Sequence, residues 1–242
     1  MSAIDTQTRP TASERTPAAG TARGAVLVLP GRGDEPAYYR RLSGRLAADG
    51  YAVEVAPRAP ETVEDVVAAW AGSDAAGAQG VRLVLGADTS AGLLATALAE
   101  ERLAPQPSGA VFAGTATDGG TRPRSGDDEL AERSACPVHR TVVAAAPAEP
   151  LAASGIPVVW PELAADLPVL AVHGGADRIS PPGRVAARLT AWNAELVTVR
   201  DGLHDVLNDV HHRSVAAEIV TFLERLRADP SARPVLTREA PR

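Results

Sequence analysis

A strand that turns directly into a helix is the feature of this sequence that most constrains the fold. Residues 81–86 form an apolar run of the kind found in buried strands, and an Ala- and Leu-rich run with helix propensity follows within a few positions. The turn between the two runs consists of small residues and carries two potential nucleophiles, Asp88 and Ser90. A turn of this kind, a nucleophile elbow, presents one side chain at its tip. We therefore predict a strand, a sharp turn and a helix over 81–102, with Asp88 or Ser90 at the tip.

The rest of the chain alternates short apolar runs with helical patterns. Glycine and proline bound most of the apolar runs, which is typical of buried parallel strands. Besides 81–86, we expect strands at 25–29, 51–56, 109–114, 169–173 and 195–200. We expect further helices at 36–49, 62–71, 183–192 and 213–227. Six strands alternating with helices predict an α/β fold with one doubly wound, mostly parallel sheet, whose chemistry lies beyond the carboxyl ends of the strands.

Four segments of the chain differ in composition. Residues 1–23 are rich in Thr, Ala, Pro and Arg and are expected to form a flexible leader. Residues 24–227 are expected to form one domain. Within it, 115–167 interrupt the alternation with turns, prolines and one helix near 128–134, so we expect a short insertion that caps the edge of the sheet. The tail 228–242 is rich in Pro and Arg and is expected to be extended or disordered.

Composition narrows the classes of function. With 242 residues, 45% of them hydrophobic and 22% charged, the chain has the composition of a globular domain. Its net charge of −6 gives no general reason to bind nucleic acid or anionic membranes. The sequence has no lysine, which excludes a Schiff-base lysine and a Walker-type phosphate loop. A single cysteine, Cys136, suits a reducing compartment, and no apolar run reaches the roughly 20 residues of a membrane span. We therefore predict a cytoplasmic protein without stable membrane insertion; the oligomeric state stays open.

Chemically distinctive residues follow several of the expected strands. A glycine-rich loop at 31–33 follows the first strand, Asp177 follows the strand at 169–173, and His204 follows the last strand. Together with the elbow, they appear in the order nucleophile, acid, histidine, which is the chain order of an α/β-hydrolase triad. In such a triad the histidine takes a proton from the nucleophile, and the acid orients and stabilises the imidazole.

Three segments resemble one protein family. Residues 30–34 read Pro-Gly-Arg-Gly-Asp, residues 168–177 read Pro-Val-Leu-Ala-Val-His-Gly-Gly-Ala-Asp, and residues 202–208 read Gly-Leu-His-Asp-Val-Leu-Asn. They are similar to the oxyanion loop, the acid-bearing strand and the histidine loop of α/β-hydrolases, in particular the monoacylglycerol lipase and lysophospholipase-like branch with its serine aminopeptidase-type members. The resemblance covers about 25–226. It implies an α/β-hydrolase fold, Asp177 as the triad acid, His204 as the base and the backbone N–H of Arg32 as an oxyanion donor.

The elbow departs from this family, because Gly-x-Ser-x-Gly is absent in either register. An elbow needs small residues two positions before and after its tip, where strand and helix nearly touch. With Asp88 at the tip these positions hold Gly86 and Ser90, whereas with Ser90 at the tip they hold Asp88 and Gly92. Geometry therefore favours Asp88.

Chemistry favours Ser90. An aspartate nucleophile suits attack on alkyl carbon, as in epoxide hydrolases and haloalkane dehalogenases. However, 115–167 contain no tyrosine for an epoxide, and the residue after Asp88 is Thr89 rather than the tryptophan of dehalogenases. Ser90 needs only the backbone N–H groups of Arg32 and Ala91 as oxyanion donors, whereas Asp88 would use that of Thr89.

Hydrolysis of a small-molecule acyl ester by Ser90, Asp177 and His204, without a cofactor, is thus the leading expectation for function. An Asp88 hydrolase of the epoxide or haloalkane type and a degenerate binding protein are the alternatives.

Other candidate residues receive structural interpretations. His173 is expected to be a satisfied histidine at a strand end. His211 and His212 lie beside the last helix without cysteine or carboxylate at metal-ligand spacing, so no metal site is predicted. Cys136 and His139 are expected to belong to a turn in the cap. The loop at 31–33 lacks the third glycine of a dinucleotide-binding motif.

Overall fold

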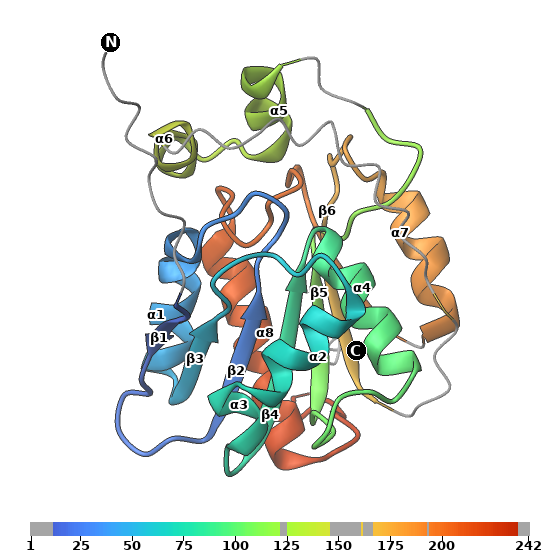
Figure 1. Cartoon of the computed structure of the whole chain (residues 1–242). Helices are drawn as coiled ribbons and strands as arrows, with labels where there is room; N and C mark the ends of the chain where they lie inside the picture. Colours follow the sequence, from blue (N-terminus) through green and yellow to red (C-terminus); the bar gives the residue numbers. More distant parts are fainter. Residues whose placement is uncertain (1–11, 122–124, 146–160, 162–166, 193, 237–242) are drawn as a thin grey trace, which may run out of the picture.

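A seven-stranded sheet forms the centre of the molecule (Figure 1). The structure is a computed structural model that describes residues 12–121, 125–145, 161, 167–192 and 194–236. The strands are β1 (Glu14–Thr16), β2 (Gly24–Leu29), β3 (Tyr51–Val55), β4 (Val81–Ala87), β5 (Gly109–Ala113), β6 (Val169–Gly174) and β7 (Glu195–Val199), in the spatial order β1-β3-β2-β4-β5-β6-β7. Strands β2 to β7 pair in parallel, and β1 pairs antiparallel with β3. The prediction of a doubly wound, mostly parallel sheet with six core strands is confirmed.

Helices cover both faces of the sheet and enclose two hydrophobic cores. One face is covered by η1 (Pro36–Tyr39), α1 (Arg40–Ala48) and α8 (His212–Ala228), and the other by α2 (Val63–Ala71), α3 (Asp74–Gly77), α4 (Thr89–Ala99) and α7 (Pro182–Leu189), which η3 (Thr190–Trp192) follows. Along β2, Val26 and Val28 enter the first core, whereas Leu27 and Leu29 enter the second. Because successive side chains of a strand point to opposite faces, an entirely apolar strand such as β2 can supply both cores.

Strand β1 differs from the expectation of a flexible leader at 1–23 for Glu14–Thr16 alone. It lies at the edge of the sheet, where Thr16 is opposite Val53, and Arg15 forms ion pairs of 2.9 Å with Glu54 and with Asp74. A three-residue polar strand carries no apolar alternation, so no hydrophobic pattern could have indicated it. Residues 1–11 lie outside the described part of the chain.

Two helices, α5 (Gly126–Arg133) and α6 (Pro137–Ala145), lie over the carboxyl ends of the strands (Figure 1). Both fall within the expected insertion at 115–167, and α5 matches the helix expected near 128–134. Helix α6 was not predicted, because Cys136 and His139 were interpreted as part of a turn. Cys136 directly precedes the helix, and His139 lies in its first turn. Pro137 is tolerated as the first helical residue, because the N–H that proline lacks would have no intrahelical partner there. Residues 122–124, 146–160 and 162–166 of the insertion are outside the described residues, as are 237–242 of the tail.

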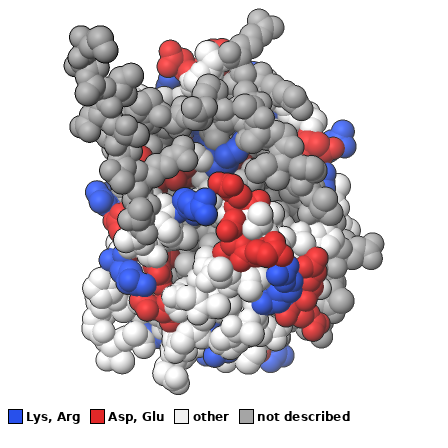
Figure 2. All heavy atoms as spheres, viewed as in Figure 1, with Lys and Arg blue, Asp and Glu red and all other residues white. Residues whose placement is uncertain are grey.

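The surface mixes both signs of charge. Figure 2 shows arginine next to aspartate and glutamate across the face that is viewed. Within the described segments, none of the helices combines the length and the apolar character that a bilayer crossing requires.

Candidate active site

Asp88 occupies the tip of the turn between β4 and α4. Its backbone has φ 50° and ψ −123°, a conformation that is uncommon for residues other than glycine. The sharp turn brings strand and helix into contact: a Cβ on Gly86 would lie 2.9 Å from the Cα and the N of Ala91. The steric requirement for a small residue at position 86 therefore places Asp88 at the tip.

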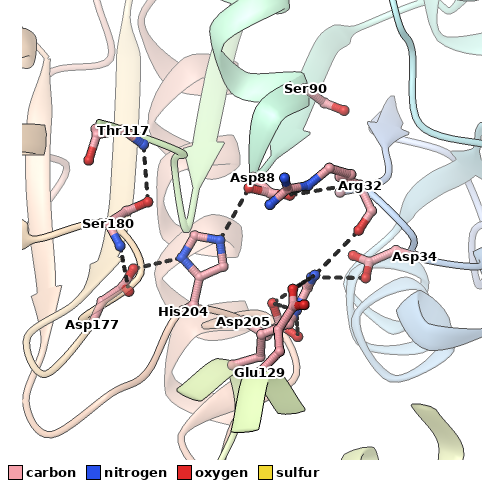
Figure 3. Close-up of polar contacts among 12 residues, drawn as sticks. Arg32, Asp34, Asp88, Ser90, Thr117, Glu129, Asp177, Ser180, His204 and Asp205 are labelled. Atoms are coloured by element: carbon pink, nitrogen blue, oxygen red, sulfur yellow. Dashed lines mark hydrogen bonds and ion pairs between the residues drawn. The ribbon is translucent and has the colours of Figure 1, made fainter. Parts of the chain in front are cut away.

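Asp88, His204 and Asp177 form one hydrogen-bonded chain (Figure 3). Nε2 of His204 lies 3.2 Å from Oδ1 of Asp88, and Nδ1 of His204 lies 2.7 Å from Oδ2 of Asp177. All three side chains are buried. They come from the end of β4, the loop after β6 and the loop after β7, so the parallel sheet brings them together at its carboxyl edge. The arrangement is a carboxylate–imidazole–carboxylate chain that begins at the tip of the turn.

Ser90 lies in the first turn of α4 and points away from His204 (Figure 3). Its hydroxyl is fully buried and donates a hydrogen bond of 2.5 Å to the carbonyl oxygen of Pro30. The N–H of Ala91 donates to the carbonyl oxygen of Asp88 at 3.3 Å. The structure therefore does not bring Ser90 and Ala91 to the positions of nucleophile and oxyanion donor; instead, Ser90 links helix α4 to the loop after β2.

The second carboxylate oxygen of Asp88 contacts Arg32, in the loop after β2. The backbone N–H of Arg32 donates to Oδ2 of Asp88 at 3.2 Å, and Nε of Arg32 lies 3.6 Å from the same atom. Thr89 is the first residue of α4, and the first N–H groups of a helix lack an intrahelical acceptor. The loop that carries Arg32 is held by Tyr39, whose hydroxyl accepts from the N–H of Gly31 at 2.9 Å and donates to Asp34 at 2.6 Å.

The charges of this site depend on each other. Burial lowers the pKa of His204, but the charges and hydrogen bonds of Asp177 and Asp88 outweigh it and raise this pKa to about 10. Burial raises the pKa of Asp88, yet the hydrogen bond and charge of His204 and the charges of Arg133 and Arg32 bring it below its ordinary value. The pKa of Asp177 is likewise lowered, against its burial, by His204 and His173. At neutral pH the site thus holds an imidazolium between two carboxylates.

His173 contacts the acid of the triad. Its Nε2 lies 2.8 Å from the carbonyl oxygen of Ser180 and 3.1 Å from Oδ2 of Asp177. The N–H of Ser180 donates to Oδ1 of Asp177 at 2.9 Å. His173 is therefore a buried, hydrogen-bonded histidine at a strand end, and it also fixes the Asp177 carboxylate.

Arg133, the last residue of α5, is the functional candidate that sequence reasoning missed. Its Nε and Nη2 lie 2.9 and 2.8 Å from Asp205, its Nη2 donates to Asp34 at 3.1 Å, and its Nη1 donates to the carbonyl oxygen of Arg32 at 3.3 Å. The side chain is almost completely buried. Asp34 and Asp205 are 99 and 72 residues away from Arg133 in the chain, so no local pattern could have indicated this cluster.

A small cavity is lined by Arg133 together with Asp88 and His204. Its volume is about 10 Å³, and its lining is formed by Asp34, Tyr39, Ala87, Asp88, Ala113, Gly114, Arg133, His204, Asp205, Val206, Leu207 and Asn208. This volume corresponds to about one water molecule. The insertion contributes the side chain of Arg133 to this lining.

The remaining candidates have separate contacts. Nε2 of His139 lies 3.3 Å from Asp205, and Sγ of Cys136 accepts a hydrogen bond of 3.5 Å from Arg41. Nδ1 of His212 lies 2.9 Å from the carbonyl oxygen of Asp209. Among the residues that the structure describes, no group of three or more histidine, cysteine, aspartate or glutamate side chains is arranged to hold a metal ion.

Comparisons with known proteins relate the chain to solved structures. No protein-family model and no curated protein matches the sequence. A soluble variant of monoglyceride lipase from Saccharomyces cerevisiae, in complex with a substrate analog, superposes with a TM-score of 0.71 at 15% identity, over 89% of this chain and 91% of that one. A monoacylglycerol lipase from Paleococcus ferrophilus has a TM-score of 0.70 at 15% identity, over 89% and 98%. A bromoperoxidase from Bacillus anthracis has a TM-score of 0.62 at 15% identity, over 88% and 94%. At this identity the likeness establishes the fold.

Proposed function

We propose that this chain, which has the α/β-hydrolase fold, is a hydrolase that uses Asp88 as its nucleophile. The observation that carries the proposal is the Asp88 carboxylate at the tip of the turn, 3.2 Å from His204, with the hydroxyl of Ser90 bonded elsewhere. A buried, ionised carboxylate in a strained turn beside a histidine is arranged for covalent catalysis.

The chemistry of a carboxylate nucleophile selects the substrate. Attack on the carbonyl carbon of an ordinary ester would form an anhydride and expel an alkoxide, a much stronger base than the carboxylate, so the reaction would run backwards. Attack on a saturated carbon instead forms an alkyl ester of Asp88 and releases the leaving group with its electron pair. We therefore infer a small alkyl electrophile as the substrate.

The second step, hydrolysis of the alkyl ester, requires a base. Alkylation lowers the pKa of His204, so that this histidine can act as the base. Conversion of Asp88 into a neutral ester removes one of the two negative charges that raise the pKa of His204. His204 then releases its proton to solvent, the neutral imidazole accepts a proton from water, and the resulting hydroxide attacks Cγ of Asp88. The N–H groups of Arg32 and Thr89 stabilise the negative charge that develops on the carbonyl oxygen. Acyl–oxygen cleavage releases the alcohol and restores the carboxylate, so that R–X and water yield R–OH, a proton and X⁻.

A trapping experiment tests this function. In the variant His204→Gln the alkyl ester forms but is not hydrolysed, because removal of a general base slows such a step by about 10² to 10⁴. Incubation with 1-bromopropane should add one propyl group to the tryptic peptide 83–102, detected by mass spectrometry. His211→Gln, which changes an exposed histidine outside the site, serves as the matched control and should not accumulate the ester. Absence of alkylation at Asp88 with every alkyl electrophile would refute the proposal and favour a degenerate binding protein.

Carboxylic-ester hydrolysis is the second candidate function, because two of the similar structures are named as monoglyceride and monoacylglycerol lipases. In this site, His204 would activate water directly once it has lost its proton at alkaline pH, and no acyl-enzyme on serine would form. Turnover of p-nitrophenyl acetate that is lost in His204→Gln, without labelling of Ser90 by a fluorophosphonate, would support this candidate. A small-molecule substrate and a cytoplasmic location belong to either proposal.

A further inference from the structure

Arg133 joins the insertion to Asp205, the residue that follows His204. The N–H of Asp205 donates to the carbonyl oxygen of Arg133 at 2.8 Å. In return, Nε of Arg133 donates to both carboxylate oxygens of Asp205 at 2.9 Å, and its Nη2 lies 2.8 Å from Oδ1. Forked contacts between a guanidinium and a carboxylate hold both groups in one geometry. Arg133 and Asp205 therefore fix each other through the backbone and through their side chains.

The residue that precedes His204 is tied to the same part of the insertion. The N–H of Leu203 donates to Oδ2 of Asp209 at 3.0 Å, and Oδ1 of Asp209 accepts from the N–H of Ala135 at 2.7 Å. The Asp209 side chain is buried. Both neighbours of His204 are thus bonded, directly or through Asp209, to residues 133–135, where α5 ends and the chain leads to α6.

Asp205 is a third carboxylate near His204, besides Asp177 and Asp88 (Figure 3). The charges of Asp205 and His204 interact, and both residues line the small cavity. Burial raises the pKa of Asp205, but the charge of Arg133 is the main cause that brings this pKa below its ordinary value. Asp205 is therefore ionised, and Arg133 offsets its charge at the imidazole. The other charged or titratable groups packed around these residues are Asp34 and Glu129 beside Arg133, His139 beside Asp205, His173 beside Asp177 and Arg32 beside Asp88.

We propose that Arg133 is a positioning residue for the hydrolytic step: it binds Asp205 so that His204 can give up its proton once Asp88 is alkylated. The inference rests on the proposed function of Asp88. With Arg133 in place, the charge of Asp205 is offset, and loss of the Asp88 charge lets the imidazole release its proton to solvent. Without Arg133, a buried carboxylate lacking its cation would keep the imidazole protonated, and water would not be activated. Hydrolysis of the alkyl ester thereby depends on contact between the insertion and the His204 loop.

The two steps of the proposed reaction depend on Arg133 to different extents. Displacement by Asp88 transfers no proton. Burial raises the pKa of Asp88, and the hydrogen bond and charge of His204 lower it more than the charge of Arg133 does, so Asp88 stays ionised when Arg133 is removed. Hydrolysis, in contrast, requires a neutral His204. We therefore expect loss of Arg133 to slow hydrolysis much more than alkylation.

Titration of His204 by nuclear magnetic resonance tests this coupling without a substrate. The background is Asp88→Asn, in which position 88 is uncharged, as it is in the alkyl ester. Adding Arg133→Gln should raise the pKa of His204 by about 1 unit, because the charge of Asp205 is no longer offset. Adding Asp205→Asn should lower this pKa, because one negative charge is removed. Adding both substitutions should cancel the two shifts, and Arg140→Gln, which removes an exposed arginine from α6, should cause none.

Single-turnover kinetics then separate the two steps in the chain with Asp88 intact. Formation of the propyl ester from 1-bromopropane and its subsequent loss are followed by mass spectrometry. Below the pKa of His204, Arg133→Gln should slow the loss of the propyl group by about 10-fold, because a shift of about one unit changes the neutral fraction of the imidazole tenfold. The deficit should shrink as the pH rises, and addition of Asp205→Asn should restore the rate.

Two results would overturn the inference. In the first, the pKa of His204 is the same with Arg133→Gln and with Asp205→Asn as without them, which would mean that Arg133 only supports the loops. In the second, Arg133→Gln slows alkylation and hydrolysis by the same factor at every pH, and Asp205→Asn deepens the defect. If Arg133→Gln does not fold, the shift in Asp205→Asn decides alone. Failure of every alkyl electrophile to label Asp88 would refute the proposed function, and the titration distinguishes that failure because it uses no electrophile.

Discussion

The variant Asp88→Asn tests whether the charge of Asp88 raises the pKa of His204, the interaction on which the proposed reaction depends. Asparagine has the shape of aspartate and, like it, tolerates positive φ, but it carries no charge, so it mimics the alkylated state. The pKa of His204 is about 10 compared with an ordinary value of 6.5, a difference of about 3.5 that corresponds to about 5 kcal/mol. Asp177 and Asp88 supply this energy together, against the cost of burial. Loss of Asp88, at 3.2 Å, should lower the pKa by roughly 1 to 3 units, the effect of one nearby opposite charge. Asp177, whose Oδ2 lies 2.7 Å from Nδ1 of His204, should keep the pKa of His204 above the pKa of an isolated buried histidine.

Nuclear magnetic resonance titration of the imidazole protons measures this pKa directly. The chain has five histidines, and the signal of His204 is identified by its loss in His204→Gln. Asp201→Asn is the matched control, because Asp201 also has positive φ, at 55°, and lies exposed in the same loop as His204. An unchanged pKa in Asp88→Asn would show that Asp88 does not interact with His204. The mechanism in which alkylation releases the base would then be refuted.

Three further predictions concern the elbow and its charges. Asp88→Ser should place a hydroxyl beside His204 and make the protein reactive toward a fluorophosphonate, with labelling at position 88; labelling at Ser90 would contradict the geometry. Ser90→Ala leaves the buried carbonyl oxygen of Pro30 without its donor, so the midpoint of urea unfolding should report a loss of about 1 to 3 kcal/mol, whereas Asp88 alkylation should persist. His204, whose pKa is raised, should stabilise the fold fully below about pH 6.5 and lose this effect as the pH rises through about 10. Asp177, whose pKa is lowered, should stabilise it above about pH 4 and lose the effect on acidification. The free energy of unfolding of the wild type and of His204→Gln is measured by urea denaturation from pH 3 to 11. The difference in favour of the wild type should fall at alkaline pH.

The fold could be predicted from sequence because its signals are local. Apolar runs bounded by glycine mark the parallel strands, and the chemistry of a parallel sheet collects at the carboxyl ends of those strands. The placement of Asp177 and His204 side by side at this edge could be predicted for this reason. Strand β1 and helix α6 could not, because the first is short and polar and the second begins with a proline in a region dominated by turns.

For the turn between β4 and α4, the steric and the chemical arguments from the sequence favoured different residues. Steric reasoning from Gly86 indicated Asp88 at the tip, and the structure places it there. The leading expectation nevertheless took Ser90, since the chemistry of the resembling family weighed more than the space between strand and helix. Arg133 lay beyond either kind of reasoning, because its partners come from two distant loops and only the folded chain brings them together.

The closed cavity has a consequence for binding kinetics. A space of about 10 Å³ is smaller than a propyl halide, so we expect a substrate of this size to bind only the fraction of molecules in which the side chains around this space have moved apart. The apparent affinity is then the intrinsic affinity multiplied by this open fraction. The observed association rate should level off at high substrate concentration, at the rate of opening. We expect substitutions of residues that line this space to change the population of the open form.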